Sequence, residues 1–277
     1  MSLKPAPSVT LLNGVTMPQL GLGTWPMNDA EAATTVEMAL KLGYRSLDTA
    51  ENYANEQGVG AGIRNAKIPR EELFVTSKFN KQWHSLDGVR TACEHSLKRL
   101  GLDYLDLFLV HWPNPAQNRY VEAFAGLVKL LETGLVRSIG TSNFKPEHLQ
   151  KLFDLGLTPQ VNQIQLDTYR TRADLVAIHQ AKGILTETWS PIGRAGALLN
   201  DPVIQQLAQN YQRTPVQIVL RWHTQLGYVP VPKSSNPQRL AENLSSFDFD
   251  LATTDLQALS QLNRTDAEIL DAETFGH

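Results

Sequence analysis

Three ionisable residues stand at the ends of apolar, strand-like segments of this chain. They are Asp48 after residues 44–47, Lys78 after residues 73–76 and His111 after residues 105–110. A tyrosine, Tyr53, follows shortly after Asp48. If these segments are parallel strands of one sheet, their carboxyl ends open on the same side, and the four side chains can meet. Together they could transfer a proton and stabilise a developing negative charge.

In such a cluster Tyr53 would be the acid. A free tyrosine has a pKa of about 10, and an adjacent cation lowers it by about 1 to 3 units, so the Lys78 ammonium is expected to bring Tyr53 towards working pH. Asp48 would keep Lys78 charged. Tyr53 could then protonate a carbonyl oxygen while His111 donates a second hydrogen bond and orients the substrate. The expected chemistry is carbonyl reduction. This reaction also needs a hydride, which no side chain of the protein can supply.

Further polar or aromatic residues close the later strand-like segments in the same manner. They are Ser142 and Asn143 after residues 136–140, Gln163 after residues 160–162, Trp189 and Ser190 after residues 184–188, and Lys233 after residues 228–231. Placement this regular is not expected by chance. It indicates one composite site at the carboxyl ends of the strands.

The segments between these strands have apolar residues at helical spacing, for example Ala33, Val36, Ala39 and Leu40. Strand and helix patterns alternate, and eight such repeats can be counted. Glycines fall where the elements must turn, at positions 43, 101, 134, 183 and 227. We therefore predict an α/β protein with a (β/α)₈, or TIM, barrel formed by residues 1–277 as a single domain.

A doubly wound sheet is the main alternative, because strand and helix alternation alone does not distinguish it from a barrel. Gly58, Gly60 and Gly62 resemble a dinucleotide-binding fingerprint, but they do not follow a strand and no suitable acidic residue lies beyond them. Helix packing explains them better. Any dinucleotide would have to be held by other means.

The two ends of the chain carry weaker signals. Residues 9–16 contain Asn13-Gly14, which favours a β-hairpin with a type I′ turn, and we expect this hairpin to close the bottom of the barrel. The tail after Asn263 is polar, and we expect it to be loosely held.

Composition excludes several classes of function. The net charge of −3 gives no broad basic field, so neither nucleic acid nor an anionic membrane is expected as a partner. The one cysteine, Cys93, cannot form an intrachain disulfide, and no apolar run suggests a signal peptide or membrane helix. The histidines are scattered, so no metal is expected. These observations predict a cytoplasmic protein, and we expect a monomer.

The motifs taken together resemble the aldo-keto reductase family, and among its members the bacterial 2,5-diketo-D-gluconate reductase branch. They are Gly-Leu-Gly-Thr-Trp at 21–25, Gly-Tyr-Arg-Ser-Leu-Asp-Thr-Ala at 43–50, Tyr53 with Asn55-Glu56, Ser77-Lys78, His111-Trp112-Pro113, residues 139–144, Val161-Asn162-Gln163-Ile164, Trp189-Ser190-Pro191 and residues 231–243. They span nearly the whole chain. The resemblance implies a barrel enzyme whose catalytic residues are Asp48, Tyr53, Lys78 and His111.

The resemblance also implies that NADPH/NADP⁺ is the cofactor. Its nicotinamide would be held by Ser142, Asn143 and Gln163 and stacked on Trp189, and its 2′-phosphate would lie near Lys233 and Arg239. The full set of expected cofactor contacts is Gly23, Thr24, Trp25, Ser142, Asn143, Gln163, Trp189, Ser190, Pro191, Ile192, Gly193, Pro232, Lys233, Ser234, Ser235, Arg239, Glu242 and Asn243.

The expected partner is a small carbonyl substrate. Its candidate contacts are Trp25, Phe79, His111, Trp112 and Asn114. Asn80 stands where many relatives have tryptophan, and both residues 113–120 and the tail after Asn263 are short. These departures predict an open, shallow, polar pocket that suits keto-sugar acids or dicarbonyls.

The residue pattern also allows other interpretations. Each of the four residues taken alone would more often be structural, with Asp48 and Lys78 as an ion pair. The barrel could be a cofactor-binding sensor or scaffold subunit. Lys78 could form a Schiff base in an aldol reaction, which would require a neutral lysine.

Overall fold

Eight parallel strands form a barrel in the computed structural model, which describes residues 3–276. The strands are β3 (Gly21–Gly23), β4 (Ser46–Asp48), β5 (Phe74–Phe79), β6 (Leu105–Val110), β7 (Val136–Ser142), β8 (Val161–Gln165), β9 (Leu185–Trp189) and β10 (Val229–Pro230). Each pairs with the next in chain order. The backbone N–H of Gly23 donates to the carbonyl oxygen of Pro232 at 3.1 Å and so joins the first strand to the segment just after the last. The predicted (β/α)₈ barrel is confirmed.

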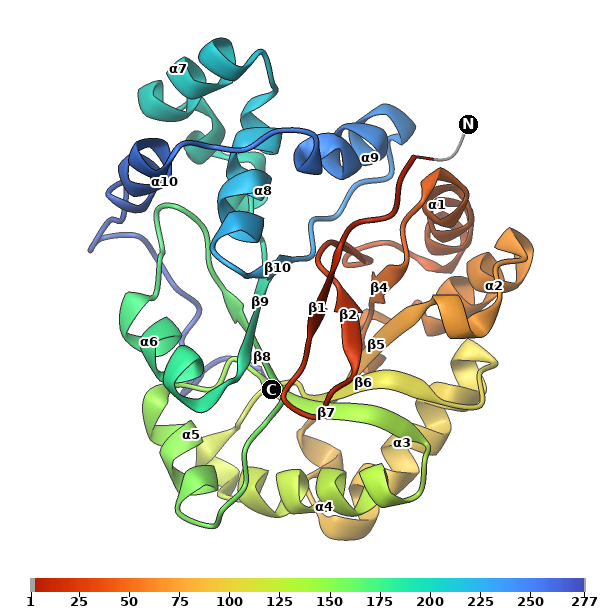
Figure 1. Ribbon diagram of the computed structural model, residues 1–277. Coiled ribbons are helices and arrows are strands. Elements are labelled where there is room, and N and C mark those ends of the chain that lie inside the picture. The colour runs from red at the N-terminus through yellow and green to blue at the C-terminus, as the bar shows by residue number, and fades with distance from the viewer. Residues whose placement is uncertain (1–2, 277) are drawn as a thin grey trace.

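Helices surround the strands (Figure 1). They are α1 (Asp29–Leu42), α2 (Glu56–Ala66), α3 (Leu86–Leu100), α4 (Tyr120–Glu132), α5 (Pro146–Phe153), α6 (Ala173–Lys182), α7 (Pro202–Tyr211), α8 (Pro215–Gln225), α9 (Pro237–Leu244) and α10 (Thr253–Ser260). The short 3₁₀ turns are η1 (Glu51–Tyr53), η2 (Arg70–Glu72), η3 (Lys81–Trp83), η4 (Pro115–Gln117), η5 (Gly193–Ala195), η6 (Ala197–Asn200) and η7 (Ser245–Phe247). Glycines 43, 101 and 183 end α1, α3 and α6 as the sequence predicts.

The N-terminal hairpin closes the end of the barrel at which the strands begin (Figure 1). It consists of β1 (Ser8–Thr10) and the antiparallel β2 (Thr16–Pro18). Buried Leu11 and Met17 belong to one apolar cluster with residues of the barrel strands, which are Phe74, Leu107, Leu109, Val161 and Val229. Full burial of one such side chain stabilises the fold by about 1.5–3 kcal/mol. The hairpin is therefore an apolar plug, as predicted.

The predicted type of hairpin turn was wrong. Leu11 N–H donates to the carbonyl oxygen of Val15, so the loop has three residues, and only Gly14 among them has a positive φ, of 84°. A type I′ turn needs positive φ at both central residues. Asn13 instead donates through Nδ2 to the carbonyl oxygen of Arg137 at 3.0 Å, which anchors the loop on β7. Tertiary contact thus outweighs the local Asn-Gly preference.

The three glycines of α2 serve helix packing, as expected. A Cβ on Gly58 would lie 2.1 Å from the carbonyl oxygen of Asp29, and one on Gly60 would lie 1.9 Å from that of Leu100. Both distances are far below van der Waals contact. Glycine is therefore needed where α2 crosses α1 and the end of α3.

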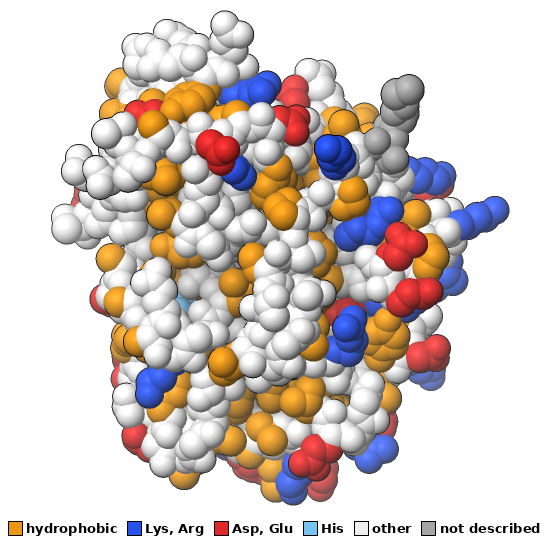
Figure 2. Space-filling view, in the orientation of Figure 1, with side chains coloured by type: hydrophobic (Ala, Val, Ile, Leu, Met, Phe, Trp, Pro, Cys, Tyr) orange, Lys and Arg blue, Asp and Glu red, His pale blue; other side chains and the backbone are white. Residues whose placement is uncertain are grey.

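Charged side chains of both signs lie close together on the face shown in Figure 2, chiefly on the side of α1 and α2. This mixture accords with the small net charge of −3. Within residues 3–276, no helix has both the length and the apolar character needed to cross a membrane.

Replacing Gly60 with Ala is expected to destabilise the protein by at least about 1–3 kcal/mol, because the new methyl group must displace the backbone at Leu100. Urea unfolding measures the loss. The control is Gln57→Ala on the exposed face of the same helix, which should stay within about 0.5 kcal/mol of the parent. Equal stabilities of the two variants would contradict this account of the packing.

Candidate active site

A buried ion pair lies at the floor of the barrel mouth. Lys78 Nζ, on β5, lies 2.7 Å from Asp48 Oδ1, on β4, and donates to the carbonyl oxygen of Thr49 at 3.0 Å. It also lies 3.4 Å from the Tyr53 hydroxyl, on η1. Lys78 has no exposed surface. Its ammonium group is therefore held between the carboxylate and the phenol, in the order predicted from the sequence.

Lys78 remains charged in this environment. Burial acts to lower the pKa of Lys78, but attraction to the Asp48 carboxylate outweighs it, and the pKa lies above its ordinary value. A Schiff-base mechanism needs a neutral amine. The ion pair with Asp48 therefore argues against the aldol alternative.

The expected lowering of the tyrosine pKa was wrong in direction. Burial is the largest influence on Tyr53 and raises its pKa, whereas the charge of Lys78 acts in the opposite direction without reversing the shift. Tyr53 is therefore protonated throughout the neutral range. The phenol still carries a proton to donate, and Lys78 is placed to stabilise the phenolate formed when it leaves.

His111 lies beside the tyrosine as a neutral ring. The two ring centroids are 5.8 Å apart in an edge-on arrangement. Burial, with a smaller contribution from the charge of Lys78, lowers the pKa of His111 well below its ordinary value. Nδ1 is buried and has no hydrogen-bond partner among the described residues. A neutral imidazole can donate one hydrogen bond, which is the role expected of His111.

Side chains on β7, β8 and β9, or just beyond them, form one connected polar wall. Gln163 Nε2 donates to Asp48 Oδ2 at 2.7 Å. Asn143 Nδ2 donates to Ser142 Oγ and to the carbonyl oxygen of His111, and its Oδ1 accepts from Trp189 Nε1 at 2.9 Å. The indole of Trp189 is thus fixed by the amide of Asn143. Interlocked donors and acceptors of this kind hold side chains in one orientation.

A cavity of about 480 Å³ opens above these residues. It is lined by Gly23, Thr24, Trp25, Pro26, Asp48, Asn52, Tyr53, His111, Trp112, Ser142, Asn143, Gln163, Trp189, Ser190, Pro191, Ile192, Arg194, Val231, Pro232, Lys233, Leu270 and Phe275. Most of the expected cofactor contacts are in this set. A volume of this size is typical of sites for small molecules.

Several expected cofactor contacts lie beyond the cavity lining. They are Gly193, Ser234, Ser235, Arg239, Glu242 and Asn243. Arg239 is exposed near the start of α9. Glu242 borders a separate shallow depression lined mainly by α7 and the start of α8, and Asn243 is buried and hydrogen-bonded to Tyr44. Asn243 therefore faces the interior of the protein.

Two expected substrate contacts do not reach the cavity. Phe79 is fully buried, and its ring packs against Phe108 and His84. Asn114 is also buried and donates to the carbonyl oxygen of Gly276 at 3.2 Å. Asn80 donates to Glu51 and does not line the cavity. Trp25, His111 and Trp112 do line it.

The tail after Asn263 is packed against the barrel, contrary to the expectation that it is loosely held. Leu270 N–H donates to Gln165 Oε1 at 3.0 Å, and Ala272 is buried. The Phe275 ring packs against Trp112, with 4.9 Å between the ring centroids. Leu270 and Phe275 thus form an apolar wall of the cavity that the sequence pattern did not predict. The pocket is less open and less polar than expected.

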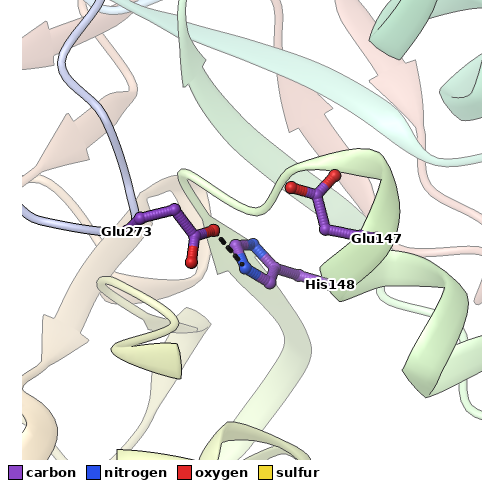
Figure 3. Close-up of side chains that lie close together, drawn as sticks. All are labelled: Glu147, His148 and Glu273. Atoms are coloured by element: carbon purple, nitrogen blue, oxygen red, sulfur yellow. Dashed lines mark ion pairs between the residues drawn. The ribbon is translucent and has the colours of Figure 1, made fainter. Parts of the chain in front are cut away.

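Charged contacts with the segment around the start of α5 hold this tail. Lys145 Nζ lies 2.5 Å from Asp271 Oδ1, and His148 Nε2 lies 3.0 Å from Glu273 Oε1 (Figure 3). Glu147 also lies close to His148 and Glu273, a grouping that could suggest a metal site. However, His148 Nδ1 accepts the backbone N–H of Lys145, so the ring proton is on Nε2 and is donated to Glu273. This arrangement leaves no lone pair on His148 for a metal ion.

Removing one member of the Asp48–Lys78 pair should strongly lower the stability of the fold. Asp48→Ala leaves the Lys78 charge buried without its anion and is expected to destabilise the fold by about 3–5 kcal/mol. Adding Lys78→Met should recover part of this loss, because no unpaired charge remains. Urea unfolding of the single and double variants at pH 7 measures both effects. Additive losses would contradict the coupling.

Comparison with known proteins places the chain in a family. Residues 17–264 match the aldo/keto reductase family model. Methylglyoxal reductase DkgA of Escherichia coli K12 is 44% identical over 270 residues, which are 97% of this chain and 98% of that protein. An aldo-keto reductase of Mycolicibacterium smegmatis is 43% identical over 273 residues, which are 98% of each chain.

Solved structures agree with this assignment. A mutant of Gox0644 in complex with NADPH has a TM-score of 0.93 and 43% identity, and the match covers 98% of each chain. Bombyx mori aldo-keto reductase in complex with NADP has a TM-score of 0.88 and 36% identity, and the match covers 94% of this chain and 93% of that one. The resemblance inferred from the motifs is confirmed, and the chain belongs to the aldo/keto reductase family.

Proposed function

We propose that this protein reduces small aldehydes and ketones to alcohols with NADPH, and that Tyr53 is the proton donor. The observation that carries the proposal is the position of Lys78, whose ammonium group lies 2.7 Å from Asp48 and 3.4 Å from the Tyr53 hydroxyl beneath the cavity. Family membership and the NADPH-bound and NADP-bound relatives support the choice of cofactor.

The residues around the cavity fit such a cofactor. Ser142, Asn143 and Gln163 offer polar groups for a carboxamide, and the indole of Trp189 offers a flat face. At the other end, Lys233 Nζ is paired with Glu31 at 3.1 Å on the partly exposed surface. An exposed pair of this kind is worth at most about 1 kcal/mol, so Lys233 can exchange Glu31 for a 2′-phosphate. NADPH, when bound, supplies the hydride.

The protein residues then handle the charge that develops on the substrate oxygen. Tyr53 donates its proton to that oxygen, and Lys78 stabilises the phenolate that remains. Asp48 balances the charge of Lys78, which makes the buried ammonium tolerable. His111, being neutral, donates a hydrogen bond without adding a second cation beside Lys78.

The walls of the cavity favour small substrates. Trp25, Trp112, Leu270 and Phe275 contribute apolar surface around the catalytic residues. This surface suits a compact dicarbonyl better than a keto-sugar acid rich in hydroxyl groups. The name of the relative DkgA, a methylglyoxal reductase, points to the same class of substrate. We therefore propose methylglyoxal-like dicarbonyls as the preferred substrates.

Tyr53→Phe is expected to lower kcat about 10²–10⁴-fold, because the proton donor is lost while the ring remains. The NADPH dissociation constant, measured by fluorescence titration, should change little. Tyr104→Phe is the matched control, since that ring packs on Arg70, near the end of the barrel where the strands begin, and should leave kcat unchanged. Near-normal turnover by the Tyr53→Phe variant would contradict the assignment. NADPH binding without turnover by the parent protein would instead favour the sensor alternative.

Phe275→Ala is expected to change substrate selection, because it removes the ring packed on Trp112 and opens the apolar wall. The ratio of kcat/KM for benzaldehyde to that for methylglyoxal should rise by at least about 10-fold. Leu155→Ala, an exposed apolar truncation beyond the end of α5, should leave the ratio unchanged. An unchanged ratio in the Phe275→Ala variant would show that the tail does not shape the substrate site.

A further inference from the structure

Glu187 is a buried carboxyl group at the active site that the mechanism above does not use. It lies on β9 directly opposite Gln163 of β8 in the strand register, and it has no exposed surface. Gln163 Nε2 donates to Glu187 Oε2 at 2.8 Å. Because Gln163 also contacts Asp48, Glu187 lies one side chain away from the catalytic ion pair.

The amide of Gln163 is fixed by two carboxyl groups. Its Nε2 has two hydrogens, and the two acceptors are Asp48 Oδ2 at 2.7 Å and Glu187 Oε2 at 2.8 Å. A reversed amide would direct an oxygen lone pair at both acceptors. Glu187 therefore determines which atom of Gln163 remains for other partners, and that atom is Oε1. Gln163 lines the cavity.

The charges around Glu187 favour its neutral form. The groups that act on its charge are Asp48 of β4 and Lys78 of β5, and Glu187 in turn acts on Tyr53 of η1. Lys78 is already neutralised by Asp48 at 2.7 Å. An ionised Glu187 would therefore add an unbalanced negative charge to a fully buried site. Burial, reinforced by repulsion from Asp48, raises the pKa of Glu187 to about 8.

The second oxygen is consistent with a protonated group. Glu187 Oε1 is buried and has no hydrogen-bond partner among residues 3–276. A buried carboxylate oxygen without a donor would be more costly than the oxygen of a neutral acid. Oε2 then acts as the carbonyl oxygen that accepts from Gln163.

We propose that Glu187 is a positioning residue for the reduction, and that its uncharged carboxyl group both fixes the amide of Gln163 and leaves the field of Lys78 directed at Tyr53. Ionisation of Glu187 would oppose loss of the Tyr53 proton, because it places a negative charge near the phenolate that forms. The inference rests on the proposed reductase function and adds a residue to it.

The test compares Glu187→Gln with Glu187→Leu. A glutamine side chain reproduces the neutral acid, since its oxygen can accept from Gln163 and it cannot ionise. The readout is the pH profile of kcat/KM for methylglyoxal from about pH 6 to about pH 10. The parent enzyme should lose activity above about pH 8, by up to about tenfold per pH unit, and the glutamine variant should hold its plateau for at least about one further pH unit. Glu122→Gln on α4, a partly exposed matched control far from the site in sequence, should keep the parent profile.

Two further measurements, of NADPH affinity and of stability against pH, do not depend on turnover. Glu187→Leu removes one of the two acceptors of Gln163 and should weaken NADPH binding by about tenfold, whereas the glutamine variant should restore most of the affinity. The folded-state pKa of Glu187, about 8, lies above its ordinary value of 4.5. Its protonation therefore stabilises the fold fully below pH 4.5, and this stabilisation is lost as pH rises to about 8. The parent should accordingly lose stability relative to Glu187→Gln over that window and not above it.

The outcomes distinguish failure of the inference about Glu187 from failure of the proposed reductase function. If the parent binds and oxidises NADPH but the glutamine variant keeps the same alkaline fall, the inference is wrong and the proposed function stands. A stability difference that does not change between pH 4.5 and about pH 8 would overturn it equally. If the parent neither binds NADPH nor reduces any carbonyl, the proposed function fails and the inference fails with it.

Discussion

The ion pair between Lys78 and Asp48 is the interaction on which the site depends. It joins β5 to β4 inside the barrel, and Gln163 on β8 donates to the second oxygen of the same carboxylate. A charge pair without solvent contact is stable only when its remaining donors and acceptors are satisfied. Thr49 and Gln163 do this, and the need to satisfy the pair therefore fixes the side chains around the cavity floor.

The two ends of the barrel have different roles, since one is packed with apolar side chains and the other carries the polar site. Where the strands begin, apolar side chains from the hairpin and the strands fill the interior, as the buried cluster that contains Met17 and Val161 illustrates. Where the strands end, inward-facing side chains are polar or charged and are held by one another. The apolar half can supply the stability that a buried polar network does not. Such a division lets the site hold a carboxylate, an ammonium group and a neutral acid close together.

The sequence predicted the fold, and the positions of Asp48, Lys78 and His111 near strand ends follow from strand periodicity. Tyr53 lies beyond β4 on the turn η1, and only its residue type and its closeness to Asp48 in the sequence indicated it. The same periodicity excludes Phe79 from the cavity, since Lys78 faces inward and its neighbour on β5 must face outward. The tail could not be predicted, because its wall comes from isolated apolar residues such as Leu270 and Phe275 in a polar segment. The pKa direction of Tyr53 was also missed, since the degree of burial is set by tertiary packing.

The hydrogen bond between Gly23 and Pro232, which closes the barrel, affects how the protein folds. These residues come from near opposite ends of the sequence, and a Cβ on Gly23 would lie 2.7 Å from the carbonyl oxygen of Val231. Contacts this distant in sequence carry a large loop-closure entropy, which makes them late events in folding. Gly23 and Pro232 both line the cavity. A ligand that bridges them would hold the ring shut, and barrel closure and site formation would be one cooperative event.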